Sequence, residues 1–242
     1  IDSVIKLRES SVTLAAIEKD ELTGLYTRQA FYHHARTFTH FMTEEKFNVV
    51  ILDVADFKLI NGTYGTKKGN EVLVYLSNAF RYYVKNGLLT RYEGDQLLGL
   101  FHSKVKMDVE RINRNINKIA EEAPIPNIRI KVGIYEDIDT SLSIPIICDR
   151  ALMAEKSISK DFKTNVAFYT DEMNQKQLAQ RQMENDFKSA IANKEFKVYY
   201  QPKYDVQTEH IVGAEALVRW IHPEKGMISP GKFIPVFESN GF

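Results

Sequence analysis

The stretch "GLLTRYEGDQLLGLF" (87–101) holds two short apolar runs separated by Gly94 and Asp95. Glycine at the first central position of a two-residue loop suits a type II′ turn, because that position needs a positive φ. The stretch therefore predicts an antiparallel β-hairpin. The polar residues Glu93, Asp95 and Gln96 lie at its turn. They are solvated turn residues, part of a catalytic edge, or part of a catalytic edge that has been altered.

The segments around the hairpin alternate between strand and helix patterns. Apolar runs predict strands at 47–57, 128–136 and 165–169, and apolar stripes at helical spacing predict helices in 66–84, 105–123 and 143–159. Helices between strands, together with one antiparallel hairpin, predict an α/β fold with a mixed central sheet and covering helices.

The two ends of the chain have a different texture. Loose helical spacing predicts an N-terminal linker helix at 1–19 that continues from an upstream segment, or alternatively a plain first helix. A polar, Gln-rich stretch at 173–185 predicts a connector helix after a first domain at 20–172. Residues 186–242 hold two strand patterns and a helix, too few to bury a core alone. We therefore expect them to open a larger domain.

Composition excludes several classes of protein. Lys+Arg and Asp+Glu number 32 each, so no overall basic field attracts nucleic acid. The single cysteine, Cys148, excludes an intrachain disulfide and fits a reducing compartment. No apolar run approaches the ~20 residues of a membrane span. We expect a cytoplasmic segment without membrane contact, either free or the cytoplasmic part of a membrane-attached sensor.

Two carboxylates of the predicted sheet are candidates for phosphate chemistry. Asp53 ends a buried strand and Asp95 lies at the hairpin turn, and ligands of open α/β sheets bind near strand ends. Such a pair suits Mg²⁺ and phosphoryl transfer, although solvated turn residues would look the same. The segment "DFKLINGTYGTKKGN" (56–70) is either a phosphate-cradling glycine loop before a helix or a plain strand-to-helix connection with a basic surface.

The strand "GAEALVRW" (213–220) places Glu215, Leu217 and Arg219 on one face, because side chains alternate along a strand. A carboxylate and a guanidinium there could bind a metal and a phosphate, and an ordinary cross-strand ion pair is the alternative. The six histidines are scattered along the chain and form no convincing ligand set.

Several segments in this order resemble two bacterial signalling domains. "DELTGLYTR", "LDVADFKLINGTYGTKKGN", "RYEGDQL", "IRIKVGI" and "CDRALMAEK" resemble GGDEF domains, which are diguanylate cyclases that condense two GTP molecules into cyclic di-GMP. Residues 186–242 resemble the start of an EAL domain, a cyclic di-GMP phosphodiesterase on a TIM-like barrel. The resemblance implies a nucleotidyl-cyclase-like GGDEF fold followed by an incomplete TIM-barrel-type segment.

The resemblance also implies roles for individual residues. Asp53 and Asp95 occupy the two Mg²⁺-holding positions, whereas Ala55 replaces a second strand acid. The nucleotide-binding positions of the family fall on Asn61, Asn70, Lys156 and Lys160. Asn70 stands where the family has a guanine-binding Asp, and an amide accepts only at its oxygen. Lys160 replaces an Arg and gives up planar bidentate contact.

The signature itself departs from the family pattern. It falls on Glu93, Gly94, Asp95, Gln96 and Leu97. Glu93 replaces a glycine that lets the nucleotide approach the backbone, and adds bulk and negative charge there. Gln96 removes an acid of the catalytic edge. The feedback-inhibition motif Arg-x-x-Asp would fall on "VKNG" (84–87) and is absent. These departures predict a degenerate GGDEF domain, with no residue assigned a catalytic role.

The EAL-like segment departs little from its family. Glu215 matches the metal-binding Glu of the motif, Arg219 a substrate-phosphate contact, and Gln201 a position near the substrate. The family's other metal ligands and its base come from later strands, so we do not expect these residues alone to hydrolyse cyclic di-GMP.

The sequence thus predicts a cyclic di-GMP signalling protein. Its impaired GGDEF domain would be a regulatory GTP-binding or dimerisation module for an EAL phosphodiesterase domain. The expected partners are GTP or cyclic di-GMP, Mg²⁺, an upstream sensor, the rest of the EAL domain and a second copy of the chain. An active diguanylate cyclase and a nucleotide-independent interaction scaffold are the alternatives.

Overall fold

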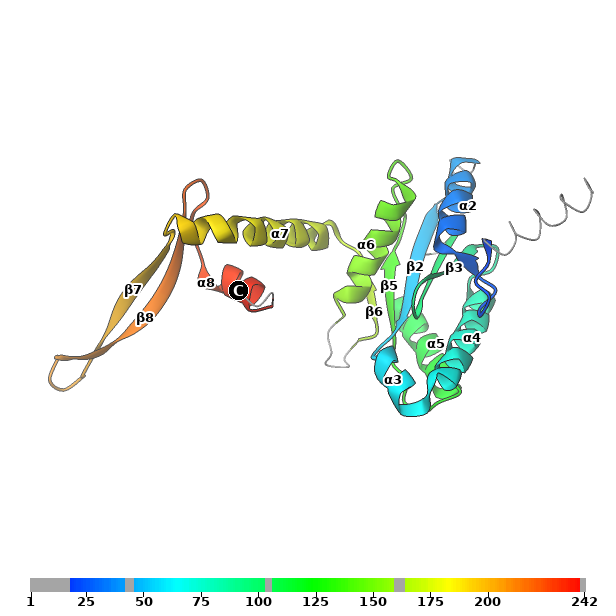
Figure 1. Cartoon of the computed structure of the whole chain (residues 1–242), viewed down its shortest axis with the longest axis horizontal. Helices are drawn as coiled ribbons and strands as arrows, with labels where there is room; N and C mark the ends of the chain where they lie inside the picture. The colour runs from blue at the N-terminus through cyan, green and yellow to red at the C-terminus, as the bar shows by residue number, and fades with distance from the viewer. Residues whose placement is uncertain (1–17, 42–45, 103–105, 159–163, 240–242) are drawn as a thin grey trace, which may run out of the picture. The chain divides into compact units, whose positions relative to one another are not determined.

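The structure is a computed structural model that describes residues 18–41, 46–102, 106–158 and 164–239 (Figure 1). The chain divides into two compact units, the first ending at Thr170 and the second beginning at Asp171. Of the linker helix expected at 1–19, residues 1–17 lie outside the described residues.

The first unit is built on a six-stranded mixed sheet with the order β1-β3-β4-β2-β5-β6 (Figure 1). Its strands are β1 (Tyr26–Thr27), β2 (Phe47–Val54), β3 (Leu88–Glu93), β4 (Gln96–His102), β5 (Ile130–Tyr135) and β6 (Val166–Phe168). The edge strands β1 and β6 run parallel to their neighbours, and the inner pairs are antiparallel. The predicted mixed α/β sheet is confirmed.

Helices cover both faces of this sheet. They are α2 (Arg28–Phe41), α3 (Phe57–Tyr64), α4 (Thr66–Tyr83), α5 (Val109–Glu121) and α6 (Ile144–Lys156). Alternate residues of β2 enter two separate apolar clusters: Val50 and Leu52 pack with α4 and α5, whereas Val49 and Ile51 pack with α2 and α6. Strand β2 is therefore buried on both sides, which explains why its sequence is a continuous apolar run.

The hairpin of β3 and β4 forms as predicted. Glu93 pairs with Gln96, so the loop consists of Gly94 and Asp95. Gly94 has φ +57°, and Asp95 is not among the residues with positive φ, the pattern of a type II′ turn. The guanidinium of Arg91 donates from Nε to the carbonyl oxygen of Gly94 at 2.8 Å and stabilises the turn.

Of the two alternatives for 56–70, a glycine loop and a plain connection, neither includes the helix that the structure shows at its start. This segment forms helix α3, a break at Gly65 with φ +83°, and the start of α4. Phe57 and Ile60 are three residues apart and both pack against the apolar core. One side of the segment is thus buried at helical spacing, which favours a helix despite its glycines.

The second unit consists of a long helix, a three-stranded antiparallel sheet and a short helix. The elements are α7 (Asp171–Ala192), β7 (Phe196–Tyr204), β8 (Ile211–His222), β9 (Gly226–Ile228) and α8 (Pro230–Ser239). Helix α7 thus extends beyond both ends of the connector expected at 173–185. No closed barrel is present among the described residues of this unit.

The second unit has a small aromatic core at one end of the hairpin. Trp220 is fully buried among Phe196, Phe233 and Phe237. Most of the β7–β8 hairpin is exposed, including several large apolar side chains: Val198, Tyr199, Tyr200, Tyr204, Ile211 and Val212. The core therefore supports only the base of the hairpin. None of the described helices is both long and apolar enough to cross a membrane.

Candidate functional site

Asp53 ends the central strand β2, and both of its carboxylate oxygens have donors. Lys131 lies directly opposite Asp53 in the β2–β5 ladder, and its Nζ is 3.0 Å from Oδ2 of Asp53. On the other side, the side-chain amide of Gln96 donates from Nε2 to Oδ1 of Asp53 at 3.3 Å. The two neighbouring strands thus each contribute one donor to this carboxylate.

A close approach of helix α6 to strand β5 brings a second carboxylate to Lys131. A Cβ at Gly133 would lie 2.2 Å from the carbonyl oxygen of Ala151 and 2.4 Å from the backbone nitrogen of Glu155. Glycine is therefore required where the helix crosses the strand. At this crossing the carboxylate of Glu155, with 2% of its side chain exposed, forms a close ion pair with Lys131.

The charges of this cluster influence one another strongly. Burial, and then the nearby charge of Asp53, raise the pKa of Asp95 above its ordinary 3.8. Burial also raises the pKa of Glu155, and the nearby charge of Asp53 raises it further. Burial opposes ionisation of Lys131, but its hydrogen bonds to Glu155 and Asp53 outweigh this and raise its pKa above 10.5. Two carboxylates, those of Asp53 and Glu155, therefore pair with one ammonium that stays charged.

The other charged residue of the signature, Glu93, is exposed and pairs with helix α2. The side chain of Glu93 is 75% exposed, and its Oε2 lies 3.7 Å from Nη1 of Arg28. An exposed pair at this distance contributes little to stability. Leu97, the last signature residue, is fully buried in the core.

The predicted nucleotide-binding residues lie on three helices. Asn61 is half-buried on α3, and its side chain occupies the space that a Cβ at Gly69 would need. Asn70 is exposed on α4, and Lys156 is the exposed last residue of α6. Lys160 lies outside the described residues. Their roles in nucleotide binding stay predictions.

Sequence reasoning did not find Lys131 or Glu155. A signal was present: Glu155 stands in the apolar stripe of α6 seven residues after Cys148 and four after Ala151, both fully buried. An acidic residue at a buried helical position needs a partner, and Lys131 is the one charged residue of strand β5. Their pairing depends on where α6 crosses the sheet.

In the second unit, the strand pairing brings the predicted EAL-type residues to one face. Gln201 and Glu215 are directly opposite each other in the β7–β8 ladder, and Arg219 follows Glu215 by four residues on the same face. Nζ of Lys203 lies 3.6 Å from Oε2 of Glu215. The shared face is as predicted, while the roles of these residues in binding metal or substrate stay predictions.

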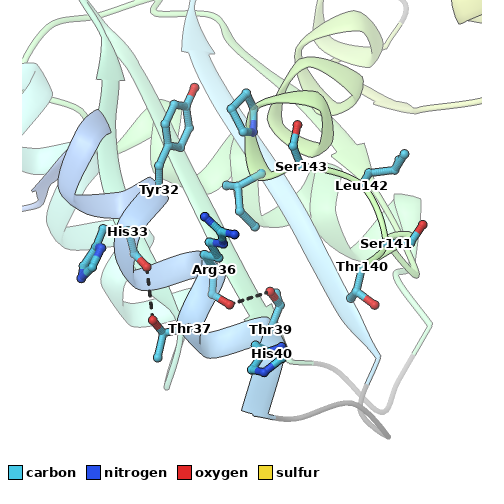
Figure 2. A pocket seen from close by; sticks show the side chains of 12 residues that line it. Tyr32, His33, Arg36, Thr37, Thr39, His40, Thr140, Ser141, Leu142 and Ser143 are labelled. Carbon is cyan, nitrogen blue, oxygen red and sulfur yellow. Dashed lines mark hydrogen bonds between the residues drawn. The ribbon is translucent and has the colours of Figure 1, made fainter.

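A separate open pocket of about 980 Å³ lies between α2 and the segment that leads into α6 (Figure 2). Its polar lining includes Arg36 and His40 from α2 and Ser141 and Ser143 from the other wall. None of the residues predicted from the sequence to form a site lines this pocket, so it is distinct from the Asp53 cluster.

The sequence matches the family model of the diguanylate cyclase GGDEF domain over residues 17–160. The chain belongs to the GGDEF family. An EAL domain model matches residues 184–242, so a GGDEF domain is followed by an EAL-type segment.

Curated relatives share this region of the chain. The chain is 27% identical over 208 residues to the "bifunctional diguanylate cyclase/cyclic di-GMP phosphodiesterase MucR" of Pseudomonas aeruginosa. This alignment covers 82% of the chain and 30% of MucR. It is 25% identical over 236 residues to the "signaling protein YkoW" of Bacillus subtilis, covering 92% of this chain and 29% of YkoW. The chain thus spans about a third of the length of such relatives.

Solved structures show the same fold. The coiled coil and GGDEF domain of DgcB from Caulobacter crescentus, in complex with c-di-GMP, superpose with a TM-score of 0.54 at 19% identity, covering 69% of this chain and 94% of that one. The S helix-GGDEF-EAL part of Vibrio cholerae LapD, bound to c-di-GMP, superposes with a TM-score of 0.57 at 15% identity. The match covers 98% of this chain and 56% of that one. At these identities the likeness concerns the fold.

The Mg²⁺ that the family implies for Asp53 and Asp95 does not fit the side chains as they stand. Mg²⁺ needs available carboxylate oxygens in a near-octahedral arrangement, and each oxygen of Asp53 already has one donor, Gln96 or Lys131, which leaves fewer lone pairs for a metal. A neighbouring ammonium also repels a cation. Among the described residues, no group of three or more His, Cys, Asp or Glu is arranged to hold a metal.

Proposed function

We propose that this GGDEF domain is not a working diguanylate cyclase and that it serves as a regulatory module for an EAL phosphodiesterase domain in cyclic di-GMP signalling. The observation that carries the proposal is the occupation of both Asp53 oxygens by Gln96 and Lys131. A carboxylate held in this way is poorly placed to help a metal activate GTP.

The hairpin supports the same conclusion. Gln96 stands where the resemblance implies an acid, and its amide uses a donor toward Asp53 instead of supplying a carboxylate. At the other end of the signature, Glu93 brings a negative charge to a position that the family keeps as glycine. A triphosphate approaching the turn would meet this charge without a metal to offset it.

The EAL-type segment supports the choice of partner. GGDEF and EAL domains follow one another in this chain as they do in cyclic di-GMP signalling proteins. Gln201, Glu215 and Arg219 share one face of the β7–β8 hairpin, which suits contact with a phosphate and a metal. The exposed apolar side chains of this hairpin are the kind of surface that the rest of an EAL domain would cover.

The regulatory ligand in this proposal is GTP, with Asn61, Asn70 and Lys156 as its contacts. Calorimetry of the chain with GTP tests this part, first without and then with Mg²⁺, and Lys156→Ala should weaken the binding. If millimolar GTP gives no heat, the domain would serve as a dimerisation module or as a scaffold. Sedimentation of the chain would distinguish a dimer from a monomer.

Absence of cyclase activity is tested directly. The purified chain is incubated with GTP and Mg²⁺, and the products are separated by chromatography. We expect no cyclic di-GMP above the level of an Asp95→Ala control. Cyclic di-GMP that forms and disappears in Asp95→Ala would overturn the proposal.

An active cyclase is the second candidate, and one observation favours it. Burial, and after it the charge of Asp53, raise the pKa of Asp95, and Gln96, the residue next to Asp95, contacts Asp53. Both carboxylates that the family uses for Mg²⁺ are thus kept at this edge of the sheet. The chromatographic test separates the two candidates.

A further inference from the structure

Lys131 is held at the Asp53–Asp95 edge from two sides. Its ammonium pairs with Asp53 across the sheet at 3.0 Å and with the buried Glu155 of helix α6. The side chains of Lys131 and Asp53 are only 20% and 15% exposed. Water screens such a pair far less than it screens an ion pair at the surface.

Helix packing fixes the position of this ammonium. Glu155 reaches Lys131 because Gly133 lets α6 lie directly against β5, and Lys131 is opposite Asp53 because of the register of β2 and β5. Backbone geometry thus determines both contacts. If the lysine side chain moved away from Glu155, it would leave a buried carboxylate without a partner, which strongly destabilises the folded chain.

A purely structural ion pair would explain only part of this arrangement. Glu155 is sufficient to neutralise Lys131, yet the ammonium also contacts Asp53. The same carboxylate accepts from Gln96, the residue next to Asp95 in the hairpin. The edge contains more negative than positive charge, which is the condition under which a family member would take up a divalent cation.

We propose that the ammonium of Lys131 is a built-in counter-cation of the Asp53–Asp95 carboxylate pair and keeps divalent metal ions out of it. A tethered ammonium lowers the negative potential that attracts a metal and occupies a carboxylate oxygen that the metal needs. This inference rests on the same Asp53–Lys131 contact as the proposed function. It concerns metal binding alone, whereas the assay for cyclic di-GMP tests the proposed function separately.

Titration of the chain with Mn²⁺ alone, followed by the electron paramagnetic resonance signal of the free ion, tests the inference. We expect the Mn²⁺ affinity of the unmodified chain to change less than about twofold in Asp53→Asn, because Asp53 does not bind the ion. The double variant Lys131→Ala/Glu155→Gln removes the ammonium together with its buried partner. It should bind Mn²⁺ at least about tenfold more tightly, which corresponds to ~1.4 kcal/mol.

Two control variants make the result specific. Lys131→Arg keeps the positive charge and should leave the Mn²⁺ affinity as in the unmodified chain. Lys46→Ala removes an ammonium that pairs with Asp137 at the surface, so it should have no effect. Adding Asp53→Asn to the double variant should abolish the gain in affinity.

Two outcomes would overturn the inference. One is Mn²⁺ binding by the unmodified chain that Asp53→Asn weakens about tenfold or more. The other is a double variant that keeps its circular dichroism spectrum and gains no affinity, because Lys131 would then not be what excludes the ion. If the double variant does not fold, the comparison of the unmodified chain with Asp53→Asn decides alone.

Discussion

Asp53 and Lys131 lie directly opposite each other on adjacent strands, with Nζ 3.0 Å from Oδ2. Gln96 of the signature hairpin contacts the same carboxylate, and Glu155 of helix α6 contacts the same ammonium. One ion pair therefore connects the hairpin, the central strand and a covering helix. Its loss should change both stability and metal binding.

Lys131→Met should lower the free energy of unfolding by about 3–5 kcal/mol, because it leaves the buried carboxylate of Glu155 without its partner. Urea denaturation at pH 7, followed by circular dichroism, measures this change.

The matched control for that prediction is Lys131→Met/Glu155→Leu, which removes both charges. Replacing both members of a buried pair by apolar side chains is often close to neutral. We expect the double variant to recover most of the stability. A double variant as unstable as Lys131→Met would mean that packing, and not charge, accounts for the loss.

Gly133→Ala should destabilise the first unit by about 1–3 kcal/mol, because its Cβ meets backbone atoms of α6 that cannot rotate away. Gly62→Ala is the control. Gly62 is an exposed helical residue with nothing within 4 Å of its would-be Cβ, so this change should stabilise the chain by about 0.5–1 kcal/mol. Thermal unfolding of both variants checks the opposite signs.

Asp20→Asn should reveal a stability contribution that disappears in acid. Burial alone would raise the pKa of Asp20, but its bonds from Thr23, at 2.7 and 2.8 Å, and its pairing with Arg91 lower it below 3.8. A group with a lowered folded pKa stabilises the protein above its unfolded pKa, and the contribution is lost as pH falls through the folded value.

The measurement is urea denaturation of both proteins between pH 7 and pH 3. We expect Asp20→Asn to be about 1–2 kcal/mol less stable at pH 7 and the difference to shrink steadily below pH 4. A difference independent of pH would show that the charge of Asp20 is unimportant.

Cys148 should not react with a thiol reagent until the first unit unfolds. Its side chain is fully buried, and burial, followed by the charge of Asp149, raises the pKa of its thiol, so almost no reactive thiolate forms at neutral pH. Labelling kinetics in increasing urea should follow global unfolding, and fast labelling of the native chain would contradict this expectation.

Much of the fold could be predicted from the sequence because its signals are local. The apolar run at 47–57 predicts a buried strand, which the structure shows at Phe47–Val54, and Gly94 predicts the hairpin because few other residues accept a positive φ. Helix α3 was not predicted, because the glycines of 56–70 suggested a loop or a plain connection, whereas Phe57 and Ile60 pack partly buried against the core at helical spacing.

The sequence by itself determined the alternation of strands and helices from residue 66 onward, the hairpin turn and the pair of carboxylates at Asp53 and Asp95, since these depend on residue type and short-range spacing. Only the tertiary structure decided what surrounds those carboxylates. Lys131 is 78 residues from Asp53 and 24 from Glu155, and the three side chains meet because strand register and the crossing of α6 at Gly133 bring them together. Charges this far apart in the sequence carry no local pattern, so the ammonium beside Asp53 appears only when the chain is folded.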